Sequence, residues 1–220
     1  KKLEKIFSSI NPLLCFSVKS NSNLAILKIL KNLGSGADVV SGGELLQALN
    51  SGIKANKIVF SGVGKSNEEI ELAIKKKILL INAESLSEVN LINNLAKKFK
   101  KKISVGLRLN PNVTAKTNRK ISTGSIRDKF GLNEKDIKKI CLSTKEFKNI
   151  RFKALSVHIG SQILSDKPII KTLKILEKLL RKIPFKFEYI DLGGGFGIKY
   201  EENQKSIKLN KYSNLVKKFK

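Results

Sequence analysis

The stretch Leu155-Ser156-Val157-His158-Ile159-Gly160-Ser161-Gln162 decides the fold, because a short apolar strand runs directly into an imidazole, a glycine and a hydroxyl. Similar apolar, β-branched segments recur along the chain, each followed by a helical pattern. Seven are expected to be strands: 14–19, 38–41, 57–61, 78–82, 103–109, 154–158 and 189–192. Their continuous apolar runs, as in residues 78–81, are typical of parallel strands that helices cover on both faces.

The segments between these strands carry helix signals. An apolar stripe at Leu24, Leu27, Ile29, Leu30 and Leu33 predicts a helix, with Gly34 as its C-terminal cap. Ser66 with Glu69, and Ser85 with Glu88, each fit a capping box that begins a helix just after a strand. Residues 168–180 form a further amphipathic helix.

This alternation of strands and helices fits either a (β/α)₈ barrel or an open doubly wound sheet. Seven strands are one short of a closed barrel, so spacing alone leaves both architectures open. The unusual residues lie at the C-terminal ends of the strands: Lys19, 41–44, 61–64, 108–111, 158–162 and 193–195. In a barrel these ends converge on one mouth, where barrel enzymes place their chemistry, whereas an open sheet spreads them along an edge. We therefore favour the barrel.

Length and composition indicate one domain, residues 1–220, with 41% hydrophobic residues. No apolar run reaches the roughly 18 residues that a membrane span needs, and the N-terminus has no apolar signal core, so we expect a cytoplasmic protein. The cysteines, Cys15 and Cys141, lack metal-ligand spacing with the single histidine, His158, and no metal site is predicted.

The formal net charge of +26 could indicate a nucleic-acid surface. Most of the basic residues are lysines, however, and no aromatic stacking residues alternate with them. We favour a solvated outer face with no specific nucleic-acid partner, and keep a basic nucleic-acid-binding module as a remote alternative.

Three strand-end features could carry chemistry. Lys19 closes an apolar strand, where partial burial would favour the neutral amine that forms Schiff bases, although a strand-end lysine can also reach solvent. His158 could stack on a flat ring or transfer a proton, or it could be a satisfied core residue. The run Gly193–Gly195 could cradle a phosphate or form a tight turn. A reactive amine, a ring-facing imidazole and a phosphate cradle together are what a pyridoxal phosphate site needs.

Six motifs occur in one order along the chain: 16–21 (FSVKSN), 36–45 (GADVVSGGEL), 60–65 (FSGVGK), 121–124 (ISTG) with 129–131 (KFG), 158–162 (HIGSQ) and 191–197 (DLGGGFG). In this order they resemble the diaminopimelate decarboxylases, which are pyridoxal-phosphate-dependent enzymes with an alanine-racemase-like barrel. The resemblance implies decarboxylation of meso-2,6-diaminopimelate to L-lysine and carbon dioxide, the last step of lysine biosynthesis, by a homodimer.

The resemblance also implies roles for individual residues. Lys19 would carry the cofactor as a Schiff base and assist proton transfer, and His158 would stack on the pyridine ring. Asp38 and Arg108 would lie near the Schiff base and the ring. The phosphate would be bound by Ser161, Gly194 and Gly195.

Two family features are not found in the sequence: an eighth strand with a Glu-Pro-Gly-Arg motif, and a C-terminal β-domain that supplies a cysteine and a tyrosine. The chain also contains no methionine. We therefore expect a partial barrel from a longer protein, inactive by itself. A decarboxylase of another diamino acid, and a pyridoxal phosphate protein or racemase without decarboxylase activity, remain alternatives.

Overall fold

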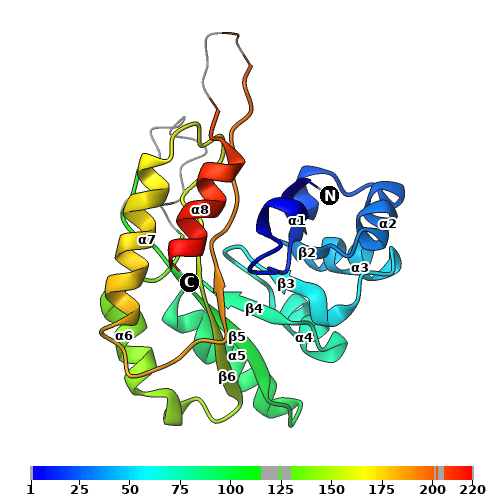
Figure 1. The fold of residues 1–220 in the computed structure, drawn as a ribbon. Helices are drawn as coiled ribbons and strands as arrows, with labels where there is room; N and C mark the ends of the chain where they lie inside the picture. Colours follow the sequence, from blue (N-terminus) through cyan, green and yellow to red (C-terminus); the bar gives the residue numbers. More distant parts are fainter. Residues whose placement is uncertain (1, 115–123, 125–129, 201, 203–205, 220) are drawn as a thin grey trace. The chain divides into compact units, whose positions relative to one another are not determined.

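A computed structural model describes residues 2–114, 124, 130–200, 202 and 206–219 (Figure 1). Residues 121–123 and 129, which belong to two of the quoted motifs, lie outside this part. The chain divides into two compact units. One, here called the lysine unit because it contains Lys19, comprises Pro12–Leu107 and Ser143–Ala154. The other, the glycine unit, contains the glycine run and comprises Lys1–Asn11, Arg108–Leu142 and Leu155–Lys220.

All seven predicted strands are confirmed, and they form one sheet in the order β1-β2-β3-β4-β5-β6-β7. Their bounds are β1 Cys15–Ser17, β2 Gly36–Val39, β3 Ile58–Phe60, β4 Leu80–Ala83, β5 Ile103–Leu109, β6 Ile150–Val157 and β7 Tyr189–Asp191. The pairs from β1 to β5 are parallel, with Ser17 opposite Asp38 and Asn82 opposite Gly106.

Strand order separates the two architectures that spacing left open. A doubly wound sheet reverses its strand order at a switch point, whereas a barrel sheet follows the sequence from one strand to the next. The order here runs from β1 to β7 without reversal. Right-handed crossovers between such strands place their helices on one face, and α2, α3, α4 and α5 pack on one another in turn. The predicted α/β barrel type is therefore confirmed.

The helices follow the predicted pattern. Their bounds are α1 Lys2–Phe7, α2 Leu24–Asn32, α3 Gly42–Asn50, α4 Asn67–Lys76, α5 Leu86–Lys98, α6 Glu134–Leu142, α7 Lys167–Leu180 and α8 Leu209–Phe219, with 3-10 turns at Val18–Ser20, Ala55–Lys57 and Thr144–Glu146. Gly34 follows α2 with a φ of 84°, as a C-terminal glycine cap requires. In the described part of the chain, no helix is long and apolar enough to cross a membrane.

The two predicted capping boxes differ in outcome. Ser66 and Glu69 form the complete reciprocal box at the start of α4. At the start of α5 the Ser85 hydroxyl accepts from the Glu88 N–H, but the reciprocal half of the prediction is wrong. The Glu88 carboxylate instead accepts from the buried Lys65 ammonium and from the Glu84 N–H.

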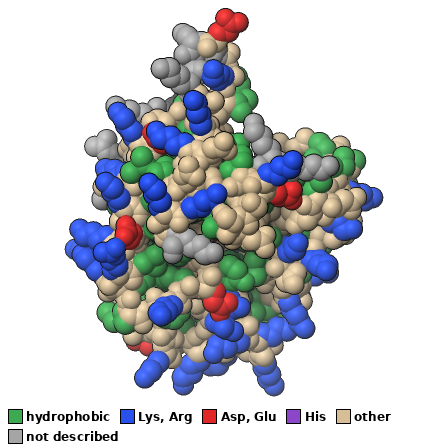
Figure 2. Space-filling view, viewed as in Figure 1, with side chains coloured by type: hydrophobic (Ala, Val, Ile, Leu, Met, Phe, Trp, Pro, Cys, Tyr) green, Lys and Arg blue, Asp and Glu red, His purple; other side chains and the backbone are tan. Residues whose placement is uncertain are grey.

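The basic residues are dispersed. Figure 2 shows Lys and Arg side chains spread over the visible face, with few acidic side chains among them. Some are in exposed ion pairs, such as Lys98 with Glu71 at 2.9 Å. On the face that Figure 2 shows, this distribution fits a solvated surface better than a single groove for a polyanion.

Tyr212 of α8 is a buried phenol in the glycine unit. Its ring packs edge-on against Phe7 and Phe196, with centroids 5.8 and 4.7 Å away. Burial, with a smaller effect from the Asp191 charge, raises the pKa of Tyr212 to about 12 from an ordinary 10. The hydroxyl therefore keeps its proton in the folded chain at a pH where the unfolded chain has lost it.

This difference predicts a pH dependence of stability. Below pH 10 the Tyr212 hydroxyl is protonated in both states and has no effect on the pH dependence of the free energy of unfolding. As the pH rises from 10 toward 12, that free energy falls by up to about 3 kcal/mol because only the unfolded state releases the proton. Chemical denaturation across this range measures the fall, and Tyr212→Phe should remove it, whereas Tyr189→Phe, at a 40% exposed site, should not. An equal slope in wild type and Tyr212→Phe would contradict the prediction.

Candidate functional site

Lys19 lies just after β1, in the 3-10 turn Val18–Ser20 of the lysine unit. The Ser20 hydroxyl donates to the Ser17 carbonyl at 2.7 Å and secures this turn. The side chain of Lys19 is exposed, so of the two alternatives for this residue the structure has the one in which the amine reaches solvent. The strand ends at Ser17, so Lys19 lies in the turn that follows and not in the sheet.

Asp38 lies on β2, beside the strand that leads to Lys19. Its carboxylate accepts a hydrogen bond from the Ser61 hydroxyl at 2.6 Å and a longer one from the Ser17 hydroxyl at 3.4 Å. The parallel register explains both contacts, because Ser17, Asp38 and Val59 lie opposite one another on β1, β2 and β3. The lysine unit thus holds a half-buried carboxylate at the base of the Lys19 turn.

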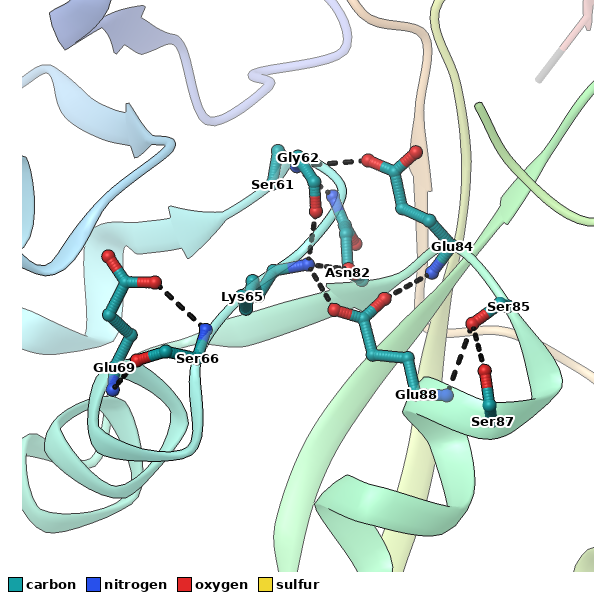
Figure 3. Close-up of polar contacts among 10 residues, drawn as sticks. All are labelled: Ser61, Gly62, Lys65, Ser66, Glu69, Asn82, Glu84, Ser85, Ser87 and Glu88. Atoms are coloured by element: carbon teal, nitrogen blue, oxygen red, sulfur yellow. Dashed lines mark hydrogen bonds and ion pairs between the residues drawn. The ribbon is translucent and has the colours of Figure 1, made fainter. Parts of the chain in front are cut away.

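A second polar cluster lies at the ends of β3 and β4 (Figure 3). It contains Lys65, Asn82, Glu84 and Glu88, which are joined to the loop Ser61–Gly62 by hydrogen bonds. Sequence reasoning assigned none of these four to a functional site, and it gave Glu88 only a place in a capping box. The only signal was the position of Lys65 at the end of the motif 60–65, and nothing in the sequence distinguishes it from the many surface lysines.

Two loops of the glycine unit run side by side after β6 and β7. The Ile163 N–H donates to the Gly195 carbonyl at 2.8 Å, and the Gly197 N–H donates to the Ile163 carbonyl at 3.0 Å. The Gln162 side chain extends this pairing, since its amide group both donates to the Ile198 carbonyl and accepts from the Ile198 N–H. We call loops 160–163 and 193–198 the paired glycine loops.

The paired glycine loops approach so closely that glycine is required at two positions. A Cβ on Gly195, whose φ is 82°, would lie 1.9 Å from the Gly160 carbonyl oxygen. A Cβ on Gly193 would lie 2.5 Å from the Val157 carbonyl oxygen, and the Gly193 N–H donates to Asp191 at 2.8 Å. Around Gly194 there is open space, with no atom within 4 Å of a Cβ built there.

His158 follows β6 and packs against the second of these loops. Its Nδ1 accepts a long hydrogen bond, 3.4 Å, from the Gly194 N–H. This contact directs the Nδ1 edge of the ring toward the loop that carries Gly194. Ser161 is exposed on the neighbouring loop. The glycine unit therefore groups His158, Ser161, Gly194 and Gly195 as the sequence predicted.

Arg108 lies at the end of β5 and is 7% exposed. Its guanidinium carbon is 4.9 Å from the centroid of the Phe130 ring, a stacking contact that holds the planar group in place. The backbone at Arg108 is also fixed, because its carbonyl accepts from the Leu132 N–H at 2.7 Å. Arg108 thus presents a fixed cation within the glycine unit.

The donors present suit a phosphorylated ligand. Backbone N–H groups of a glycine loop and a serine hydroxyl are typical phosphate donors, and a Cβ built on Gly194 would meet no atom within 4 Å. The paired glycine loops hold these groups in place without side chains that would fill the space around Gly194. In the lysine unit, Lys19 supplies an exposed amine and Asp38 a hydrogen-bonded carboxylate. That all strand ends serve one site stays a prediction.

Comparison with known proteins gives one family. The family described as "Pyridoxal-dependent decarboxylase, pyridoxal binding domain" matches residues 1–219. A diaminopimelate decarboxylase of Helicobacter pylori strain J99 is 42% identical over 213 residues, which are 96% of this chain and 52% of that protein. The Campylobacter jejuni diaminopimelate decarboxylase is 41% identical over 205 residues, 92% of this chain and 51% of that protein. The chain spans about half the length of the curated relatives it matches.

Solved structures show the same likeness. The crystal structure of the Helicobacter pylori enzyme complexed with L-lysine has a TM-score of 0.95 and 40% identity, and the match covers 99% of this chain and 56% of that one. The diaminopimelate decarboxylase of M. jannaschii in complex with L-lysine has a TM-score of 0.88 and 34% identity, and the match covers 99% and 53%. The fold is therefore that of these proteins.

Proposed function

Because the chain belongs to the pyridoxal-dependent decarboxylase family, as a pyridoxal-binding domain, we propose that the complete protein decarboxylates meso-2,6-diaminopimelate to L-lysine and carbon dioxide. The choice of substrate rests on identities of about 40% to diaminopimelate decarboxylases over nearly the whole chain. The crystal structure of the Helicobacter pylori relative with L-lysine, the product of that reaction, supports the same choice.

The observation that carries the proposal is the pair of glycine loops. Their close approach, 1.9 Å from a Cβ on Gly195 to the Gly160 oxygen, leaves no room for a side chain at Gly195. Glycine loses more conformational entropy on folding than other residues, so a run of ordered glycines is costly. A role in binding a phosphate through backbone N–H groups would explain why the chain has such a run here. In the proposal, Gly194, Gly195 and Ser161 hold the cofactor phosphate.

The remaining residues receive roles that match their surroundings. Lys19 offers the amine that holds the cofactor aldehyde, and its exposed position after β1 leaves it accessible to that group. His158 stacks its imidazole against the pyridine ring. Asp38 of the lysine unit and Arg108 of the glycine unit are each proposed to bind the cofactor.

Pyridoxal phosphate, when bound, supplies an electron-withdrawing ring that takes up the electron pair left when carbon dioxide departs. The chain's own residues then hold and move protons. Lys19, in its ammonium form, would donate a proton to the carbon that lost the carboxylate and become the neutral amine. The hydrogen bonds that Asp38 accepts from Ser61 and Ser17 hold its carboxylate in one orientation.

A covalent trapping experiment tests the proposal. The complete protein is incubated with pyridoxal phosphate, its visible absorbance is recorded, and borohydride is added before peptide mass spectrometry. We expect a visible band and a cofactor adduct on Lys19, both absent in Lys19→Ala. Lys28→Ala, which removes another exposed lysine of the same unit, is the matched control and should keep both. No band and no adduct in the wild type would refute the cofactor role.

The substrate needs a separate measurement. Release of carbon dioxide from meso-2,6-diaminopimelate, compared with D-ornithine and D-lysine, distinguishes the proposed reaction from that of a related decarboxylase. Racemisation without carbon dioxide would indicate a racemase instead. The homodimer expected from the family resemblance stays a prediction, which sedimentation of the complete protein can check.

A further inference from the structure

Lys65 is a buried lysine for which the proposed reaction has no use. Its side chain is 1% exposed, and its ammonium donates to the Gly62 carbonyl at 2.6 Å, the Asn82 carbonyl at 2.7 Å and Glu88 Oε1 at 2.9 Å (Figure 3). An ammonium has three protons, so all are in use. Burying a charge is costly unless it is paired and fully hydrogen-bonded, and Lys65 meets both conditions.

The partners of Lys65 form a closed ring of hydrogen bonds around one residue, Gly62. The second oxygen of Glu88 accepts from the Glu84 N–H at 2.7 Å, and Glu84 Oε1 accepts from the Gly62 N–H at 2.9 Å. The residue Gly62 is therefore held at both ends, with its N–H bound by Glu84 and its carbonyl bound by Lys65. Gly62 has a φ of 101°, a conformation that this ring of contacts maintains.

The ring reaches Asp38 through a single residue. Ser61 precedes Gly62 and donates its hydroxyl proton to Asp38 Oδ1 at 2.6 Å. The same hydroxyl accepts from the Asn82 side-chain amide at 3.2 Å, and the Asn82 carbonyl is bound by Lys65. Lys65 thus holds the residue that follows Ser61 in the chain, Gly62, and also Asn82, which donates to the Ser61 hydroxyl.

From this geometry we infer that Lys65 is a positioning residue for the cofactor. Its ammonium holds the loop after β3 so that Ser61 directs the Asp38 carboxylate, while Lys65 itself does not contact the cofactor. The inference rests on the proposed function, which places Asp38 at the cofactor. Arginine cannot substitute, because a planar guanidinium does not match three acceptors arranged around one ammonium.

The test separates positioning from stability. Lys65→Met removes the charge and leaves Glu88 buried without its cation, so it can fail to fold. The double variant Lys65→Met/Glu88→Gln removes both charges and avoids that cost. Lys98→Met, which breaks only the exposed pair with Glu71, is the control. For each complete protein, the melting temperature, the dissociation constant of pyridoxal phosphate and the pH profile of the cofactor absorbance are measured.

The double variant should melt near the wild-type temperature but bind the cofactor between about tenfold and 100-fold more weakly, as expected when a binding group is displaced by up to about 1 Å. The absorbance–pH profile of the bound cofactor should shift in the double variant, because the distance between the Asp38 carboxylate and the cofactor changes. Lys98→Met should match the wild type in all three measurements. Wild-type affinity and an unchanged profile in the double variant would overturn the inference.

A measurement without cofactor keeps the two proposals apart. The carboxyl carbon resonance of Asp38, read by NMR in the cofactor-free protein, reports its hydrogen bond from Ser61. We expect this resonance to move in the double variant and to stay in place in Lys98→Met. An unmoved resonance in the double variant refutes the role of Lys65. Failure of the wild type to bind pyridoxal phosphate refutes the proposed function instead.

Discussion

Replacement of Gly195 by alanine is expected to destabilise the chain by about 3 kcal/mol and to abolish measurable cofactor binding. The added Cβ would lie 1.9 Å from the Gly160 oxygen and 3.0 Å from its carbonyl carbon. Both are backbone atoms and cannot rotate away. The φ of 82° at Gly195 adds strain for any residue with a side chain. The paired glycine loops must separate, and the phosphate donors separate with them.

Gly194→Ala is the matched control for this prediction. A Cβ there meets no atom within 4 Å, so the free energy of unfolding should stay within about 0.5 kcal/mol of the wild type. Chemical denaturation measures both variants, and absorbance titration with pyridoxal phosphate measures binding. Equal stability of Gly195→Ala and the wild type would show that the loops are not held together as described. If Gly194→Ala keeps its stability but weakens binding, the open space beside Gly194 is the phosphate site.

Gly106→Ala is expected to destabilise the lysine unit by about 2 kcal/mol. Gly106 lies opposite Asn82 in the parallel pair β4–β5, and its Cβ would lie 2.1 Å from Asn82 Oδ1 and 3.3 Å from the Ala154 Cβ. Asn82 is 2% exposed and donates to Ser61, so it has little freedom to move. Strand β5 therefore leaves room for the buried Asn82 side chain of β4 only because residue 106 is glycine.

A double-mutant cycle checks the cause of this effect. Asn82→Ala removes the amide that the new Cβ would meet, so the combined variant Gly106→Ala/Asn82→Ala should be more stable than the sum of the single effects by about 1 kcal/mol. Gly43→Ala, where a Cβ would make ordinary contact with Ser41 Oγ at 3.8 Å, is the neutral control. Simple additivity in the cycle would mean that Asn82 is not the obstacle at Gly106.

The sequence by itself determined the seven strands, the order of the motifs and several positions where glycine allows a positive φ. These features depend on short-range patterns: apolar runs for buried strands, Ser66 with Glu69 for a capping box, and glycine where φ is positive. The grouping of His158 with Ser161 and the glycine run also followed, because parallel strands in sequential order bring successive strand ends together.

Only the tertiary structure decided which charged groups are buried and what they bind. Lys65 and Glu88 are 23 residues apart, and Gly62 and Glu84 are 22 apart, so no local pattern links them. The same long-range contacts drew Glu88 away from its predicted capping box, and a local turn left Lys19 exposed where a strand would have covered it. Burial and partner choice depend on the packing of distant segments, because a buried charge is stable only where several groups converge on it.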